Sequence, residues 1–436
     1  MNNISSRRIY ESSLLQEKYE KISHRSGLDI YVFKKDLTAT YAIFGVKYGS
    51  IHNKFSIKSN NENKEITVPD GIAHFLEHKL FTNEDGSDSF EKFSKYGADA
   101  NAYTSFNKTA YLFSCTEGFE KSLAELITFV THPYFTEESI ASEIGIISEE
   151  IKMYDDNPSD RCFYGMLEGM YEKHSIRNNI CGSIDSISKI TKKTLYDCYN
   201  NFYNLNNMAL IVCGNVDTDT VLMIADELLP TVSSPFTVST VDENLYESPN
   251  AFKGYVEQKM QVSKPIFNIG IKDTDIPTDP VARQKKDAAM AILDEMLFSR
   301  AGALYSSLFE RELISPNMSY GYTISASSAY NSIAGEADDP QKVLDEILAY
   351  ISEVSKAGLS YEDFLRGKRV MYAEFVKSFD STDNIANNLL SFVCEDAELL
   401  SYTDVIESVT FEDVTHLFNT MFDTKQITLS VVRPLN

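Results

Sequence analysis

The chain has 436 residues, which is too long for one comfortable hydrophobic core and predicts two or three domains. Its apolar content of 43% and aromatic content of 12% are typical of a globular protein, and no stretch approaches the roughly 18 apolar residues of a membrane helix. The formal net charge of −24 argues against nucleic acid and anionic membrane as partners, because both repel an acidic surface.

The N-terminus indicates a cytoplasmic protein, and the cysteines indicate free thiols. Residues 1–8 lack the apolar segment of a secretory signal, so we expect a cytoplasmic location. No CxxC pair occurs among the six cysteines, which makes disulfides or a thiolate zinc knuckle unexpected and buried thiols the preferred interpretation. These cysteines are Cys115, Cys162, Cys181, Cys198, Cys213 and Cys394.

The first half of the chain is expected to mix strands with helices. Residues 30–33 and 41–48 have the apolar character of strands, and residues 208–213 form a third such run. Helices are expected to begin near Gly71, Ser87, Phe119 and Thr136. Strict alternation of strand and helix is missing, so the predicted fold class is α+β.

The segment HFLEH at 74–78 has the spacing of a metal site on a helix. Asp70 is a suitable N-cap, so the helix is expected to begin at the next residue. His74 and His78, four residues apart, project from one helix face and suit two ligands of one metal. Glu77 beside them could take a proton from zinc-bound water. The alternative is a helix with two hydrogen-bonded histidines near the core.

A helix predicted over residues 136–156 offers a third ligand. Glu143 and Glu150 flank its apolar stripe on nearly one line, whereas Glu149 faces solvent. A carboxylate beside a buried stripe costs desolvation unless a positive charge pairs with it, as a zinc ion would. We expect Glu150 to bind the metal and Glu143 to orient a histidine. The alternative is that both carboxylates form salt bridges.

The second half of the chain repeats the pattern of the first. Residues 44–47 (FGVK) resemble residues 269–272 (IGIK), and residues 187–191 resemble residues 406–410. Several such matches in the same order predict two copies of one domain. The polar, proline-containing segment 233–250 is expected to link them.

This division gives a domain at 1–232 and a degenerate copy at 251–436. The metal helix has a counterpart at 289–298, where Ala291 and Glu295 stand in place of the two histidines. The packing residues persist in the copy and the ligands do not. The sequence therefore predicts one metal site, in the first half only.

The motifs resemble those of the pitrilysin/insulinase family of zinc peptidases, which are inverzincins. HFLEH followed by EIGIISEE at 143–150 resembles the family's HxxEH and downstream E-x6-E, and residues 97–104 resemble its Gly-x-x-x-Asn-Ala-x-Thr segment. The resemblance covers essentially the whole chain and implies two homologous domains, each a mainly antiparallel sheet packed with helices. It implies one Zn²⁺ per chain, bound by His74, His78 and Glu150, with Glu77 as the base.

The resemblance also implies where a peptide would bind. In such enzymes the substrate adds to the edge of the strand beside the metal, and an ordinary sheet strand is the alternative. The corresponding residues here are Asn101, Ala102, Tyr103 and Thr104.

The second half of such enzymes usually offers an arginine and a tyrosine toward the active site. Phe309 occupies the expected arginine position, and Arg311 follows two residues later. Tyr320 and Tyr322 lie in the neighbourhood of the expected tyrosine. The resemblance therefore implies that Arg311 contacts substrate and that these tyrosines help to hold the oxyanion.

The sequence thus predicts a zinc-dependent endopeptidase that hydrolyses peptides or unfolded segments, in maturation or degradation. By the resemblance, we expect a homodimer or a heterodimer with a paralogue. The alternative from another class is a non-catalytic or partner-dependent scaffold subunit, because the family includes degenerate members. The intact HxxEH segment favours the enzyme.

Overall fold

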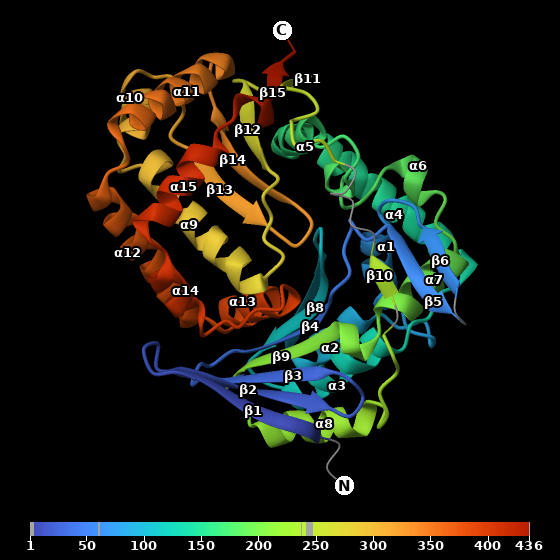
Figure 1. The fold of residues 1–436 in the computed structure, drawn as a ribbon. Helices are drawn as coiled ribbons and strands as arrows, with labels where there is room; N and C mark the ends of the chain where they lie inside the picture. The colour runs from blue at the N-terminus through green and yellow to red at the C-terminus, as the bar shows by residue number, and fades with distance from the viewer. Residues whose placement is uncertain (1–3, 60–61, 237, 241–246, 436) are drawn as a thin grey trace. The chain divides into compact units, whose positions relative to one another are not determined.

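The computed structural model describes residues 4–59, 62–236, 238–240 and 247–435. The chain divides into two compact units (Figure 1). Unit 1 comprises Met1–Ile151, Asn179–Val241 and Val376–Ser401, and unit 2 comprises Lys152–Asn178, Asp242–Phe375 and Tyr402–Asn436. Compared with the contiguous domains 1–232 and 251–436, the units exchange one segment each. Residues 237 and 241–246 of the predicted linker lie outside the described part of the chain.

Unit 1 is built on a seven-stranded sheet with the order β1-β2-β3-β9-β4-β8-β7. Neighbouring strands are antiparallel except β3 and β9, which are parallel. The strands are β1 (Ile4–Ser12), β2 (Glu17–His24), β3 (Asp29–Lys34), β4 (Thr40–Val46), β7 (Ala98–Thr104), β8 (Thr109–Cys115) and β9 (Met208–Gly214). A smaller sheet has the order β10-β5-β6 and contains β5 (Lys54–Ser59), β6 (Glu62–Thr67) and β10 (Val238–Thr240).

Helices cover both faces of the unit 1 sheet. Helices α1 and α3 contact strands on one face, and α13 packs on β4 and β9 from the other. Every residue of β4 and β9 is buried, as expected of strands covered on both faces. The helices are α1 (Ile72–Leu80), α2 (Ser89–Tyr96), α3 (Phe119–Thr131), α4 (Glu137–Asp155), α6 (Ile184–Ile187), α7 (Lys192–Phe202), α8 (Thr218–Leu228) and α13 (Thr382–Cys394), with short 3₁₀ turns at Leu205–Asn207 and Ser378–Asp380.

Unit 2 repeats five adjacent strands of the unit 1 sheet, from β3 to the edge strand β7. Its sheet has the order β11-β15-β12-β14-β13, with β11 and β15 parallel and the other pairs antiparallel. This matches β3-β9-β4-β8-β7 of unit 1 in order and direction, which confirms the predicted duplication and the mainly antiparallel sheets. The strands are β11 (Tyr255–Met260), β12 (Ile266–Asp273), β13 (Ser319–Ile324), β14 (Ala329–Glu336) and β15 (Ile427–Pro434).

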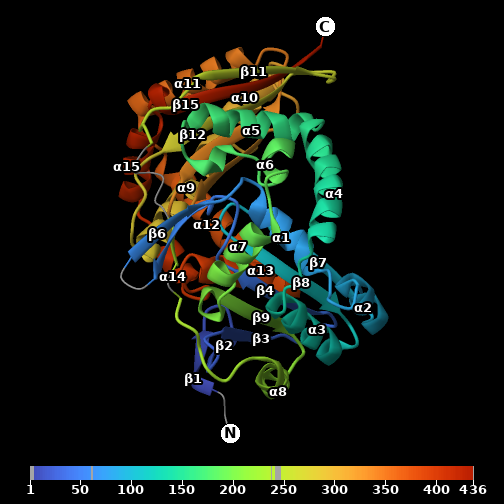
Figure 2. The same ribbon diagram turned by 90° about the vertical axis from the view of Figure 1, so that its right-hand side faces the viewer.

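The helices of unit 2 also correspond to those of unit 1. Helix α5 packs on β12 and β15 (Figure 2). Helix α9 packs against β13, and α14 and α15 contact α9. The helices are α5 (Pro158–Met170), α9 (Pro280–Phe298), α10 (Ala303–Glu310), α11 (Pro340–Ala357), α12 (Tyr361–Lys377), α14 (Tyr402–Ser408) and α15 (Phe411–Met421), with 3₁₀ turns at Ser175–Arg177 and Thr424–Gln426.

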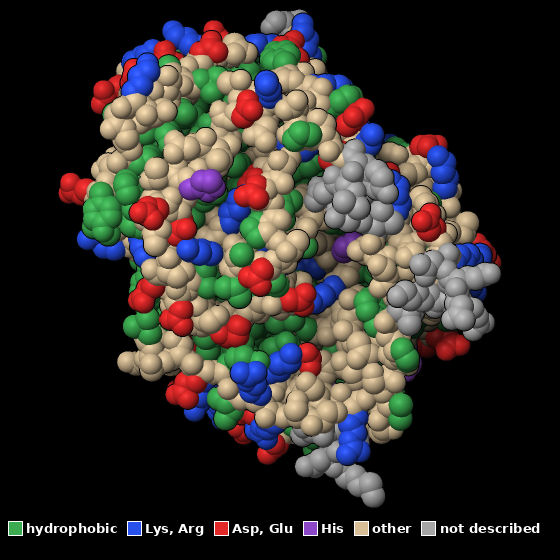
Figure 3. Space-filling model, in the orientation of Figure 1, with side chains coloured by type: hydrophobic (Ala, Val, Ile, Leu, Met, Phe, Trp, Pro, Cys, Tyr) green, Lys and Arg blue, Asp and Glu red, His purple; other side chains and the backbone are tan. Residues whose placement is uncertain are grey.

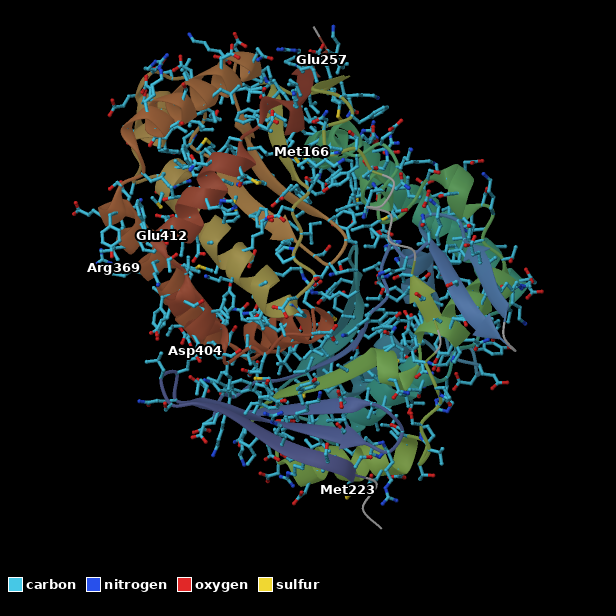
Figure 4. All side chains as sticks on the ribbon, viewed as in Figure 1. Met166, Met223, Glu257, Arg369, Asp404 and Glu412 are labelled. Carbon is cyan, nitrogen blue, oxygen red and sulfur yellow. The ribbon has the colours of Figure 1, made fainter. Side chains whose placement is uncertain are left out.

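One glycine in each sheet makes room for the exchanged helix. A Cβ on Gly45 of β4 would lie 2.2 Å from Leu390 of α13, and one on Gly270 of β12 would lie 2.5 Å from Met166 of α5. Figure 4 labels Met166 between α5 and β12. These glycines are the ones that align in the FGVK and IGIK segments of the repeat. The repeated motif therefore marks a close approach of helix to sheet.

The surface and the cysteines agree with the composition. Figure 3 shows acidic and basic side chains interspersed over one face of the molecule. None of the six cysteines forms a disulfide, and all except Cys394 are buried, as predicted. Within the described residues, no helix is both long enough and apolar enough to cross a membrane.

Candidate metal centre

Helix α1, which carries the HFLEH segment, begins differently from the prediction. Asp70 is not its N-cap: the Asp70 carboxylate accepts a hydrogen bond from Asn53 Nδ2 at 2.5 Å. Gly71 occupies the cap position with φ of 88°, and its carbonyl accepts from the Phe75 N–H at 2.9 Å. A left-handed residue suits glycine, so the backbone alone turns the chain into the helix.

Helices α1 and α4, which carry the three predicted ligands, lie side by side (Figures 1 and 2). His74 Nε2 lies 3.6 Å from Glu150 Oε1, and His78 Nε2 lies 3.4 Å from Glu150 Oε2. The two imidazole rings have centroids 4.6 Å apart. Both Nε2 atoms therefore face one carboxylate.

Each of these two separations fits a pair of ligands on a zinc ion. They are longer than the roughly 2.7–3.2 Å of a good N–H···O hydrogen bond. Donor atoms about 2.0–2.3 Å from one tetrahedral zinc stand roughly 3.3–3.6 Å apart, which is close to the observed spacing. His74 Nδ1 is buried and has no hydrogen-bond partner among the described residues. The polar contacts of this ring among the described residues are therefore made by Nε2, the atom that faces Glu150.

Glu143 lies behind His78. Its Oε1 is 3.1 Å from His78 Nδ1, and its Oε2 accepts from Lys79 Nζ at 3.2 Å. Burial alone would lower the pKa of His78, but the hydrogen bond to Glu143 and the nearby carboxylates outweigh it and raise that pKa. Glu143 therefore makes both the histidine contact and the salt bridge that the sequence left open as alternatives.

Glu77 is enclosed between the helix and the sheet. It is 7% exposed, and Thr104 Oγ1 donates a hydrogen bond to its Oε2 at 2.6 Å. Burial raises the pKa of Glu77, and the neighbouring histidines and Thr104 offset part of this rise. Thr104 was expected on a substrate-binding strand, but its contact with Glu77 could not be predicted, because only the fold brings β7 to α1.

Strand β7 is the last strand of its sheet, so it has an edge that is not paired within the described sheet. The Asn101 side chain accepts a hydrogen bond from the Ala102 N–H at 2.8 Å. Tyr103 donates through its hydroxyl to Asn387 Oδ1 of α13 at 3.1 Å. The position at the edge is as expected, and substrate binding by these residues stays a prediction.

Cys181 also belongs to this cluster, although the sequence did not predict it there. Its Sγ lies 3.8 Å from His74 Nε2. Potential donor atoms of His74, Glu150 and Cys181 all lie within 4.8 Å of one another, and this group, which does not include His78, is the only one of its kind among the described residues. The sequence indicated only a buried thiol, because no local motif connects Cys181 with α1.

The second-half residues assigned by resemblance have partners inside unit 2. Tyr320 donates to Glu295 Oε2 at 2.9 Å, and Tyr322 donates to Asp273 Oδ2 at 2.6 Å. Arg311 is exposed and forms an ion pair within the unit. The roles of these three residues in catalysis and substrate binding stay predictions.

Unit 2 keeps the architecture of the metal site without its ligands. Helices α9 and α12 correspond to α1 and α4, and Glu295 of α9 stands where unit 1 has His78. Glu295 forms an ion pair with Arg366 of α12. This ion pair joins the two helices as the His78–Glu143 contact does in unit 1.

Comparison with known proteins identifies the family. The family model described as Insulinase (Peptidase family M16) matches residues 57–183, and the Peptidase M16 inactive domain matches residues 189–371. The uncharacterized zinc protease YmfH of Bacillus subtilis is 38% identical over 97% of this chain and 98% of its own length. This chain belongs to the pitrilysin/insulinase family. The match of this M16 protein to the inactive domain agrees with the loss of both histidines in the second copy.

Solved structures confirm the duplicated fold of the M16 chain. The crystal structure of an M16-like peptidase candidate from Alicyclobacillus acidocaldarius has a TM-score of 0.90 at 28% identity, covering 98% of this chain and 99% of that one. A protease from Helicobacter pylori has a TM-score of 0.81 at 17% identity, covering 96% and 100%, which supports the fold alone. Relatives of this chain within the family, such as YmfH, are named zinc proteases.

Proposed function

We propose that this M16 protein is a zinc-dependent endopeptidase. The observation that carries the proposal is the convergence of His74, His78 and Glu150 in unit 1, with Glu77 on the same helix as the histidines. Relatives named zinc proteases support it, including YmfH over nearly the full chain. The substrates proposed are peptides or unfolded segments.

In this proposal, the three ligands hold one Zn²⁺ per chain. A zinc ion held there supplies Lewis acidity for the attack of water on a peptide carbonyl. Glu143 accepts a hydrogen bond from His78 Nδ1, which keeps the lone pair of Nε2 available for the metal. The carboxylate thereby fixes both the ring orientation and the tautomer of His78.

Glu77 moves the proton. It takes a proton from the attacking water and passes it to the amine nitrogen as the C–N bond breaks. Thr104 donates to one carboxylate oxygen, which leaves the other for the proton. Burial raises the pKa of Glu77 and so makes its carboxylate a stronger base than one in water.

The substrate would lie extended along the edge of β7. Main-chain hydrogen bonds from residues 101–104 can hold peptides of many sequences. The Ala102 N–H at this edge is capped by the Asn101 side chain, which an added strand would displace. On the resemblance alone, we assign Tyr320 and Tyr322 to the oxyanion and Arg311 to substrate binding. A cytoplasmic location and a homodimer or a heterodimer with a paralogue remain proposals on the same basis.

Metal removal and reconstitution test the proposal. The chelator-treated protein is expected to cleave no unstructured basic peptide, and about one equivalent of Zn²⁺ per chain should restore internal cleavage, detected by mass spectrometry. His78→Gln should not be restored, whereas His416→Gln, on an exposed residue of α15, should behave as the wild type. A zinc-replete protein that cleaves no peptide would support the scaffold subunit instead.

A further inference from the structure

We propose that Cys181 is a fourth protein donor for the metal that His74, His78 and Glu150 hold. The inference deepens the proposed function and rests on its metal site, but it does not depend on peptide cleavage. Cys181 lies in the loop before α6, and the family motif does not include this residue.

The geometry of the donor atoms carries the inference. Cys181 Sγ lies 3.8 Å from His74 Nε2. The same nitrogen lies 3.6 Å from Glu150 Oε1. A thiolate about 2.3 Å and an imidazole about 2.0 Å from one tetrahedral zinc stand roughly 3.5 Å apart. Cys181 is 5% exposed, so a charged thiolate there requires a positive partner.

The loop that carries Cys181 packs closely against the start of α1. Gly71 and Gly182 both have positive φ, 88° and 73°. A Cβ on Gly71 would lie 2.4 Å from the Cys181 carbonyl oxygen, and one on Gly182 would lie 2.5 Å from the Asp70 carbonyl oxygen. The start of α1 and the loop therefore pack backbone to backbone at two glycines, where no side chain fits. This contact fixes the position of the thiol along α1.

Hydrogen bonds within the loop complete this fixation. The Cys181 N–H donates to Asn179 Oδ1 at 2.9 Å, and the Gly182 N–H donates to the Asn179 carbonyl at 2.8 Å. Ser186 Oγ donates to the Asp70 carbonyl at 2.8 Å and ties the following turn to the same point. The thiol is thus held beside His74 by the backbone of its own loop.

Four protein donors close a zinc site, whereas a catalytic site keeps one position for water. Cys181 therefore competes with water and with the substrate carbonyl for the fourth position.

Cobalt substitution of the full-length protein tests the inference. Co²⁺ alone is added to the metal-free wild type, Cys181→Ser, Cys181→Ala and Cys115→Ser, and the thiolate-to-cobalt charge-transfer absorption is recorded. Cys115 is the matched control, because it lies in unit 1 and has the same 5% exposure. Zn²⁺ affinity is measured on the same proteins by competition with a chelating dye.

The wild type and Cys115→Ser are expected to show the charge-transfer band, and both Cys181 variants to lack it. Loss of a donor should weaken Zn²⁺ binding at least about tenfold in the Cys181 variants. Metal binding without a thiolate band, and with unchanged affinity in Cys181→Ala, overturns the Cys181 assignment and leaves the proposed function standing. Failure of the wild type to bind any metal overturns both.

Discussion

At the scale of single residues, Glu143 supports two neighbours at once. One carboxylate oxygen contacts His78 and the other contacts Lys79, whose side chain is only 3% exposed. The carboxylate therefore compensates a buried ammonium and orients a metal ligand. Because both tasks use one side chain, a single substitution should damage stability and metal binding together.

Glu143→Ala is expected to destabilise the protein by about 3 kcal/mol, because it leaves the Lys79 charge buried without this carboxylate. Zn²⁺ affinity should fall about 10–100-fold as His78 loses its orienting partner. Chemical denaturation and chelator competition measure the two effects. The double variant Glu143→Ala/Lys79→Met should recover stability but not affinity. Equal stability of wild type and Glu143→Ala would contradict the account.

Asp294 in unit 2 makes stability depend on pH. Its side chain is buried, one oxygen accepts from Asn331 Nδ2, and the other has no hydrogen-bond partner among the described residues. Burial raises the pKa of Asp294 to about 7. Because the folded-state pKa exceeds the unfolded value of about 3.9, the folded state binds more protons between these values. The stability from this group is fully present below about pH 4 and is lost as pH rises through 7.

Asp294→Asn should remove this dependence. The wild type is expected to lose up to about 1.4 kcal/mol of unfolding free energy per pH unit between pH 4 and 7 through Asp294, and the variant should lose correspondingly less. Denaturant titrations of both proteins at pH 5, 6, 7 and 8 give the comparison. Parallel pH profiles for the two proteins would show that Asp294 does not titrate in this range.

Site residues that belong to one local sequence pattern could be predicted, whereas site residues that only the tertiary fold brings together could not. The helical period alone indicated that His74 and His78 share a face with Glu77 beside them, and it separated Glu150 from the exposed Glu149. Thr104 and Cys181 reach the same place from a strand edge and a loop. No spacing rule connects such segments, so only the tertiary structure reveals their contacts.

At the scale of elements, the repeated glycines explain how each sheet receives a helix from the other half of the chain. Leu390 of α13 lies where a Cβ of Gly45 would be, and Met166 of α5 lies against Gly270. The repeat was recognisable because strand patterns and glycines persist in both copies. The exchange was not, because an amphipathic helix does not specify which sheet it covers.

Gly45→Ala should therefore destabilise the protein by about 1–3 kcal/mol, since the added methyl overlaps a fully buried leucine. Gly270→Ala should cost less, because flexible methionines can move aside. Gly321→Ala is the control: it lies in a strand too, but its added Cβ meets nothing within 4 Å. Equal unfolding free energies for Gly45→Ala and Gly321→Ala would rule out the close approach.

At the scale of the whole molecule, the compact units do not follow the two halves of the sequence. Residues 1–232 lack α13, which covers β4 and β9, and residues 251–436 lack α5, which covers β12 and β15. Each half alone therefore leaves one face of its sheet uncovered. The halves are copies in sequence, but each needs the other to complete its core.

Fragments 1–232 and 251–436 are expected to aggregate or to stay partly unfolded when expressed separately. Coexpression should yield a complex that co-purifies through a tag on either fragment and unfolds cooperatively. Circular dichroism and denaturation of the separate and combined fragments provide the measurement. A fragment that unfolds cooperatively alone, with the stability of the intact chain, would refute the required exchange.

The most direct test of the central claim is the turnover of the zinc-loaded Glu77→Gln variant on an unstructured peptide. With the metal ligands intact, this variant should retain about one zinc per chain while kcat falls about 10²–10⁴-fold, because the proton acceptor is lost. Glu149→Gln, on the exposed side of α4, should keep wild-type kcat. A zinc-loaded Glu77→Gln protein with wild-type kcat would contradict the account.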